Sequence, residues 1–185
     1  MAMPASSPPL MTAEEILYLD LPGKSTELVR GHLIVSEPPS TRHGVAAARL
    51  SYLIADYVYR NALGVVCGQD TGFHIATNPD TVRAPDVAFV RRERAALIPE
   101  TGYARLSPDL VVEIVSPGDQ PGELLSKVWD WLDAGTPLVW VIDAARRQAR
   151  IHREDGRVAL VAADGLLGGE AALPGFSCAV AEVFR

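Results

Sequence analysis

The sequence lacks several features that would assign a protein to a class at once. It has no run of about 20 apolar residues, so no membrane-spanning helix is expected. Its start, Met1 to Pro9, has no basic segment followed by an apolar one, so we expect a short disordered leader over residues 1–10 rather than a signal peptide. Cys67 and Cys178 stand at neither metal-ligand nor redox-motif spacing. Two such cysteines without a signal peptide predict a cytoplasmic protein.

Common catalytic motifs are also missing. There is no glycine-rich phosphate loop, no Gly-x-Ser-x-Gly elbow and no redox motif. The four histidines are scattered without ligand spacing, which argues against a zinc site. The formal net charge of −6 argues against a surface that grips nucleic acid non-specifically. It does not exclude an enzyme acting on DNA, because acidic metal ligands contribute to the same total.

The 185 residues, 48% of them hydrophobic, are enough for one well-packed domain, which we place at residues 11–185. Apolar spacing and turn signals predict helices at 12–19, 41–61 and 123–134, a hairpin at 26–37, and strands at 64–67, 72–76, 85–90, 109–117 and 137–143. We predict that the turn at 78–80 leads into the strand at 85–90, that Gly135 ends the third helix, and that the chain after Arg147 begins with a hairpin turning at Asp155-Gly156. The fold class is α/β, with a mixed sheet flanked by helices.

The strand Asp109-Leu-Val-Val-Glu-Ile-Val-Ser-Pro117 carries an acid among aliphatic residues. Alternation places Leu110, Val112 and Ile114 on one face of this strand and Glu113 on the other, between two valines. Apolar residues on both faces are typical of a central strand. A carboxylate in that position must be paired, protonated or bound to a metal.

A second acid lies on a neighbouring apolar segment, Ala84-Pro-Asp-Val-Ala-Phe-Val90. Asp86 and Glu113 on adjacent strands, with a backbone carbonyl such as that of Ile114, would supply the oxygen ligands that Mg²⁺ prefers, and Mn²⁺ could take its place. The alternative is structural: Asp86 caps a turn after Pro85, and Glu113 forms an ion pair. Spacing alone does not decide between them.

Three more residues are candidates for this site. Lys127, on the border of the apolar face of the third helix, could stabilise a phosphate or a water, although a border lysine usually only extends to solvent. Glu27 could reach the same pocket as a further acid, or be solvated on an exposed strand. His43 opens the long helix, where it could act as a cap or contact a phosphate.

The order of these motifs resembles the Uma-two (Uma2) family of restriction endonucleases, within the PD-(D/E)XK nuclease superfamily. The resemblance extends from Met11 to Phe184. The motifs that carry it are Thr12-Ala-Glu-Glu15, Glu27-Leu-Val-Arg-Gly-His-Leu33, Arg42-His43, the two acidic segments above, Lys127, Gly135 and Trp140-Val-Ile-Asp143. Two positions depart from the family pattern: Trp131 replaces a tyrosine, and Leu138-Val139 replaces a polar-aromatic pair. Both departures are interpreted as packing changes.

The resemblance implies a Mg²⁺-dependent endonuclease that hydrolyses phosphodiester bonds of DNA. In that family pattern Asp86 and Glu113 hold the metal, Lys127 is the catalytic lysine and Glu27 is the supporting acid. A homodimer is expected, because cutting both strands of a duplex favours two-fold symmetry. The alternative is a catalytically silent module that binds nucleic acid or protein on a nuclease fold, because a fold does not fix a function.

Overall fold

The computed structural model describes residues 9–185, so the expected leader lies largely outside the described residues. A six-stranded sheet forms its centre, in the order β10-β9-β8-β7-β6-β3. These strands are β3 (Gly64–Cys67), β6 (Val87–Arg91), β7 (Leu110–Ile114), β8 (Leu138–Asp143), β9 (Gln148–Arg153) and β10 (Val158–Val161). The β7–β8 pair is parallel and the other pairs are antiparallel, which confirms the mixed sheet.

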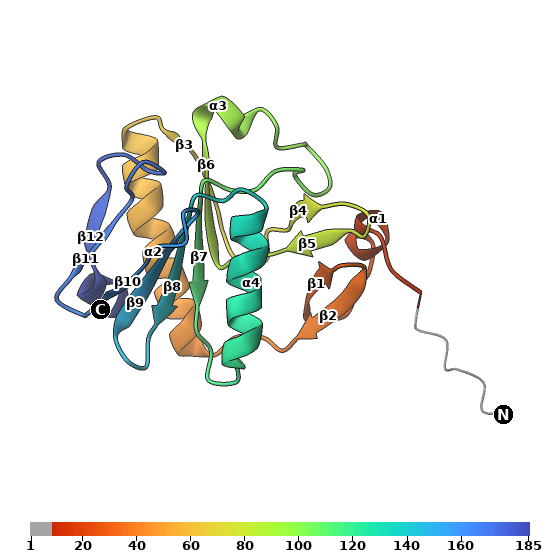
Figure 1. Cartoon of the computed structure of the whole chain (residues 1–185), viewed down its shortest axis with the longest axis horizontal. Helices are drawn as coiled ribbons and strands as arrows, with labels where there is room; N and C mark the ends of the chain where they lie inside the picture. Colours follow the sequence, from red (N-terminus) through yellow and green to blue (C-terminus); the bar gives the residue numbers. More distant parts are fainter. Residues whose placement is uncertain (1–8) are drawn as a thin grey trace.

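Each face of this sheet carries its own apolar core. A helix lies over each face (Figure 1). On one face, Leu110, Val112 and Ile114 of β7 pack against α2 (Thr41–Arg60) and the C-terminal segment. That segment comprises β11 (Leu166–Gly168), β12 (Ser177–Ala179) and the 3-10 helix η1 (Val180–Phe184). On the other face, Val111 and its neighbours pack against α4 (Pro121–Asp133). The predicted alternation along β7 is therefore confirmed.

A second sheet, in the order β2-β1-β5-β4, lies beside the first (Figure 1). Its strands are β1 (Ser25–Val29), β2 (His32–Ser36), β4 (Phe73–Ala76) and β5 (Thr81–Arg83). The predicted hairpin is β1–β2. The expectation that the turn at 78–80 leads directly into the strand at 85–90 is wrong, because β5 intervenes and pairs with β1 and β4. Three residues are too few to show a period-two pattern in the sequence.

Local signals set the ends of the helices. Thr12 and Glu15 form the predicted capping box of α1 (Ala13–Leu17), which ends two residues earlier than expected. Gly135 ends α4 with a positive φ of 94°. The N–H groups of Gly135 and Thr136 donate to the carbonyls of Leu132 and Trp131, which is the Schellman arrangement. The short α3 (Arg92–Ala95) follows β6 directly. No helix within residues 9–185 has the length and apolar character needed to cross a bilayer.

Candidate active site

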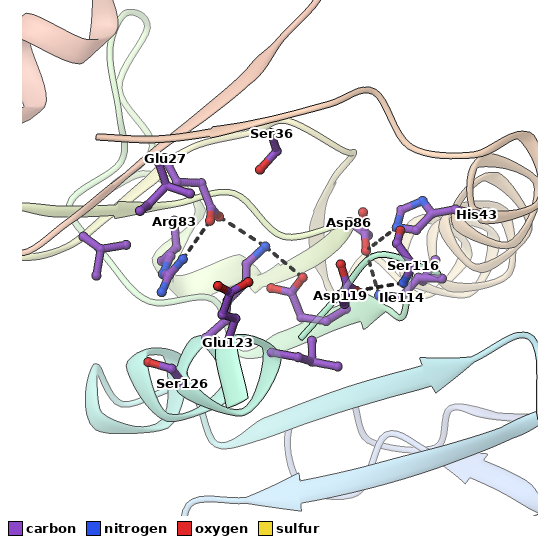
Figure 2. Close-up of a pocket in the computed structure, with 15 residues that line it drawn as sticks. Glu27, Ser36, His43, Arg83, Asp86, Ile114, Ser116, Asp119, Glu123 and Ser126 are labelled. Atoms are coloured by element: carbon purple, nitrogen blue, oxygen red, sulfur yellow. Dashed lines mark hydrogen bonds and ion pairs between the residues drawn. The ribbon is translucent and has the colours of Figure 1, made fainter. Parts of the chain in front are cut away.

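A cleft of about 360 Å³ opens where the two sheets meet, beside the first turns of α2 and α4. All four residues predicted for the site line it: Glu27, Asp86, Glu113 and Lys127. They come from β1, the segment before β6, the middle of β7 and the second turn of α4. Figure 2 shows Glu27 and Arg83 at one side of the cleft and Asp86 and His43 at the other. The fold thus brings together groups that lie far apart in the sequence.

Lys127 lies at the centre of this cluster and contacts three of its groups. Its Nζ lies 3.0 Å from Glu113 Oε2 and 3.1 Å from Glu27 Oε1, and it donates a hydrogen bond of 2.8 Å to the carbonyl of Ala84. The Lys127 side chain is 19% exposed, so it does not extend to solvent as a border lysine usually does. Its ammonium instead joins α4 to both sheets, at the floor of the cleft.

Trp131 corrects one interpretation from the sequence. Its Nε1–H donates a 2.7 Å hydrogen bond to Glu113 Oε1, and its side chain is fully buried. Because Lys127 occupies the other oxygen, both oxygens of Glu113 are held in fixed directions. The change to tryptophan at position 131 therefore does more than fill space: it orients the carboxylate. The one sequence signal for this role was that Trp131 lies one helical turn after Lys127, which does not distinguish an orienting donor from a core residue.

Asp86 accepts hydrogen bonds from two directions. Ile114 N–H donates to Oδ2 at 2.7 Å, and the Gln69 side chain donates to Oδ1 at 3.3 Å. His43 Nε2 lies 3.2 Å from the same Oδ2. His43 is not the cap of α2, because Ser40 caps the helix by accepting from the backbone N–H of His43. The imidazole instead fixes the orientation of Asp86, a role that the sequence position alone does not indicate.

A buried ion-pair network supports Glu27 and was not predicted. Arg83 Nη1 lies 2.8 Å from Glu27 Oε2, and Arg83 Nη2 lies 2.6 Å from Asp130 Oδ2. The Ala84 N–H donates to Glu27 Oε1 at 2.7 Å. Glu27 is therefore a partly buried, fully paired acid rather than a solvated one. Arg83 and Asp130 connect β5 and α4 through this network.

Burial and neighbouring charges set the proton affinities of the cluster. Burial raises the pKa of the Glu113 carboxyl to about 7, with the opposing effect of Lys127 overcome. Burial also acts to raise the pKa of Glu27, but the charges of Lys127 and Arg83 outweigh it and leave that pKa below its ordinary value. Burial lowers the pKa of Lys127 less than Glu113 and Glu27 raise it, so Lys127 stays charged. The cluster therefore carries one carboxyl, that of Glu113, which is only partly ionised near neutral pH.

The residues of the cleft fit a hard divalent cation. Asp86 directly before β6 and Glu113 on the neighbouring strand β7 are oxygen donors, and the carbonyl of Ile114 lies on the same strand as Glu113. The raised pKa of Glu113 shows that Lys127 alone does not offset the burial of this carboxyl. Within residues 9–185 no three His, Cys, Asp or Glu side chains are grouped to hold one metal ion. A cation here would therefore need backbone and water oxygens besides the two acids.

The mouth of the cleft is acidic. Four exposed acids line it or the adjoining pocket: Glu37, Asp70, Asp119 and Glu123. The cations among the residues that line these pockets are Lys127 and Arg83, and both are paired with carboxylates inside the protein. The side chains at the mouth therefore repel a polyanion unless cations screen them.

We expect Glu113→Gln to leave the fold intact and to reduce the loss of stability between pH 5 and pH 8. The pKa of Glu113 in the folded protein lies above its ordinary value of 4.5, so the native state holds this proton more tightly than the unfolded chain. Ionisation of Glu113 therefore destabilises the fold as the pH rises through about 7. Glutamine does not titrate, so the fall should be smaller by about 1–3 kcal/mol. Urea unfolding of both proteins at the two pH values measures this difference, and an unfolded variant would instead make Glu113 a purely structural partner.

Fold and site together define a nuclease-type α/β protein, in which an acid directly before β6 and an acid on the neighbouring strand β7 lie beside a lysine from the following helix. The chain belongs to the Uma2 family, described as "Putative restriction endonuclease", whose sequence profile matches residues 13–181. A crystal structure of a "putative nuclease belonging to DUF820" from Anabaena variabilis superimposes with a TM-score of 0.78. It is 19% identical and covers 94% of this chain and 97% of its own, which shows a common fold. No curated protein is significantly similar to the sequence.

Proposed function

We propose that the protein is a metal-dependent endonuclease that hydrolyses phosphodiester bonds of DNA, with Asp86 and Glu113 holding Mg²⁺ or Mn²⁺. The observation that carries this proposal is the convergence of Glu27, Glu113 and Lys127 beside Asp86 in one open cleft. Membership of a family of nucleases supports the same reaction class. Mg²⁺ bound there would polarise the scissile phosphate and lower the pKa of an attacking water.

The side chains of the cleft divide the remaining work. Lys127 presents a fixed positive charge that can orient the attacking water or stabilise the charge that develops on the phosphate. Glu27, held by Arg83, fixes the position of the Lys127 ammonium. Trp131 and His43 fix the two acids, and their buried positions exclude water from the rear of these carboxylates. Such preorganisation is what a phosphoryl-transfer site requires.

The proposal predicts that wild type binds Mg²⁺ and Mn²⁺ in calorimetric titration and that Asp86→Asn does not. Asparagine keeps the size of the side chain but removes one of the two negative charges offered to the cation. Asp70→Asn is a matched control, because Asp70 is an exposed acid at the mouth of the cleft and is not one of the two proposed metal ligands. If Asp86→Asn bound the metals as wild type does, the assignment of Asp86 would be wrong. Binding lost only in Asp86→Asn would justify a screen of DNA substrates.

The acidic mouth of the cleft favours a second candidate function, a catalytically silent binding module on the same fold. Its exposed carboxylates oppose a DNA backbone, in agreement with the net charge of −6. The calorimetric experiment separates the two functions when it is repeated with a short DNA duplex present, since some sites assemble only around the substrate. Absence of metal binding in both conditions would favour the binding module.

A further inference from the structure

One face of α2 carries apolar side chains that the rest of residues 9–185 leaves exposed. The opposite face is buried against the sheet through His43, Ala46, Ala47, Leu50, Ile54 and Val58. The outward residues that we call the outer stripe are Thr41, Val45, Ala48, Tyr52, Ala55 and Tyr59. Val45, Tyr52 and Tyr59 are 53%, 58% and 59% exposed. Large apolar groups gathered along one helix face mark an interaction surface rather than chance exposure.

The spacing of the outer stripe identifies the kind of partner it fits. Its members alternate at steps of four and three residues over the whole helix, which is the a/d pattern of a helix that packs against another helix. Val45 and the two tyrosines occupy one of the two positions, and Thr41 and the two alanines occupy the other. Large and small side chains therefore alternate along the seam, so each large residue needs a small one opposite.

A second copy of the same helix, running antiparallel, meets this requirement. It places Tyr59 opposite Thr41, Val45 opposite Ala55, and Tyr52 opposite Ala48 of the other copy. A parallel copy would instead set tyrosine against tyrosine and alanine against alanine, which leaves both clashes and gaps. Antiparallel pairing also aligns the helix dipoles favourably.

Charges on the border of the outer stripe agree with the same arrangement. Arg42, near the start of α2, would lie opposite Asp56 of the other copy, and the two-fold axis generates this pair twice. Asp56 also pairs with Arg60 of its own chain at 2.9 Å, so Arg42 would join an existing ion pair. A parallel arrangement would set Arg42 against Arg42. Arg49, near the axis, is already engaged within its own chain: Nε donates to the Glu182 carbonyl at 3.3 Å, and the guanidinium lies over the Tyr52 ring.

We propose that the protein forms a two-fold symmetric homodimer through antiparallel packing of the outer stripe of α2 against the same stripe of a second copy. This surface lies on the solvent side of α2, whose first turn holds His43 at the cleft. The dimer does not depend on the proposed nuclease activity, and its test needs neither metal nor DNA.

Sedimentation velocity over about 1–100 µM, a range in which modest interfaces dissociate, tests the proposal. Wild type should show a concentration-dependent dimer. Tyr52→Glu should raise the dissociation constant at least about 30-fold, the loss expected for a central aromatic anchor. Leu160→Glu is the control, because Leu160 is 64% exposed on the edge strand β10. A wild type that is monomeric throughout, or a dimer broken by Leu160→Glu and not by Tyr52→Glu, would overturn the proposal.

Cross-linking tests the direction of packing. In a Cys67→Ser background, which leaves only the buried Cys178, a short bismaleimide should link Val45→Cys/Ala55→Cys into covalent dimers and should leave Val45→Cys alone unlinked. The two 45 positions are far apart in an antiparallel pair, whereas a parallel pair would bring them together. Efficient linkage of Val45→Cys alone would refute the antiparallel arrangement.

Discussion

We expect Lys127→Met to lower the free energy of unfolding by about 3–5 kcal/mol at pH 8, the range found when one partner of a buried ion pair is removed. Without the ammonium, the carboxylates of Glu27 and Glu113 face one another across the floor of the cleft. The loss should be much smaller at pH 5, because Glu113 then carries its proton. Urea unfolding at both pH values measures the two losses.

Two comparisons sharpen this experiment. Lys24→Met removes a lysine that pairs with the exposed Glu37, and it should change stability by less than about 1 kcal/mol. Lys127→Met/Glu113→Gln should recover part of the loss at pH 8, since it also removes the carboxylate left without a partner. Equal stability of wild type and Lys127→Met at pH 8 would mean that Lys127 does not stabilise the carboxylates of Glu27 and Glu113, contrary to their distances.

Arg83→Met should be about as destabilising, by about 3–5 kcal/mol at pH 7. The Arg83 side chain is 8% exposed and neutralises Glu27 and Asp130, which come from β1 and α4. Methionine fills a similar volume but removes the cation that the two acids share, which leaves Glu27 with Lys127 and Asp130 with the more exposed Arg30. Chemical denaturation monitored by tryptophan fluorescence would measure the change, because Trp131 lies in the same helix as Asp130.

The matched control is Arg60→Ala. Arg60 pairs with Asp56 at 2.9 Å on the surface of α2, where its side chain is 75% exposed, so its loss should cost less than about 0.5 kcal/mol. Arg83→Met/Asp130→Asn should be more stable than Arg83→Met alone, because one of the two carboxylates that lost Arg83 is then neutral. If Arg83→Met proved as mild as Arg60→Ala, the network would not hold the second sheet and α4 together.

The sequence was sufficient to predict the elements whose apolar residues recur with a clear period. The alternation around Glu113 predicted a central strand with Glu113 opposite Leu110, Val112 and Ile114, and the structure has it so. Turn chemistry at Gly135 and at Asp155-Gly156 also placed the ends of α4 and the β9–β10 hairpin. The strand β5 was missed, because Thr81–Arg83 is too short to show any period.

The four site residues could be named from the sequence, but their supporting contacts could not. Arg83 lies between two turn-forming segments and has the sequence context of a solvated loop residue. Its partner Glu27 is 56 residues away and its partner Asp130 is 47 residues away, so no local spacing reveals them. The contacts of Trp131 with Glu113 and of His43 with Asp86 are likewise tertiary. Only the folded structure shows which side chains hydrogen-bond to each acid or pair with it.

The floor of the cleft is assembled from two sheets and a helix, and this determines when the site can form during synthesis of the chain. Glu27 is made early and its partner Lys127 late, and the contacts that join them are long-range in sequence. A nascent chain that ends before α4 has neither the lysine nor the indole that orients Glu113. An incomplete chain that lacks α4 therefore cannot assemble the floor of the cleft, so the site forms only after most of the chain has been synthesised.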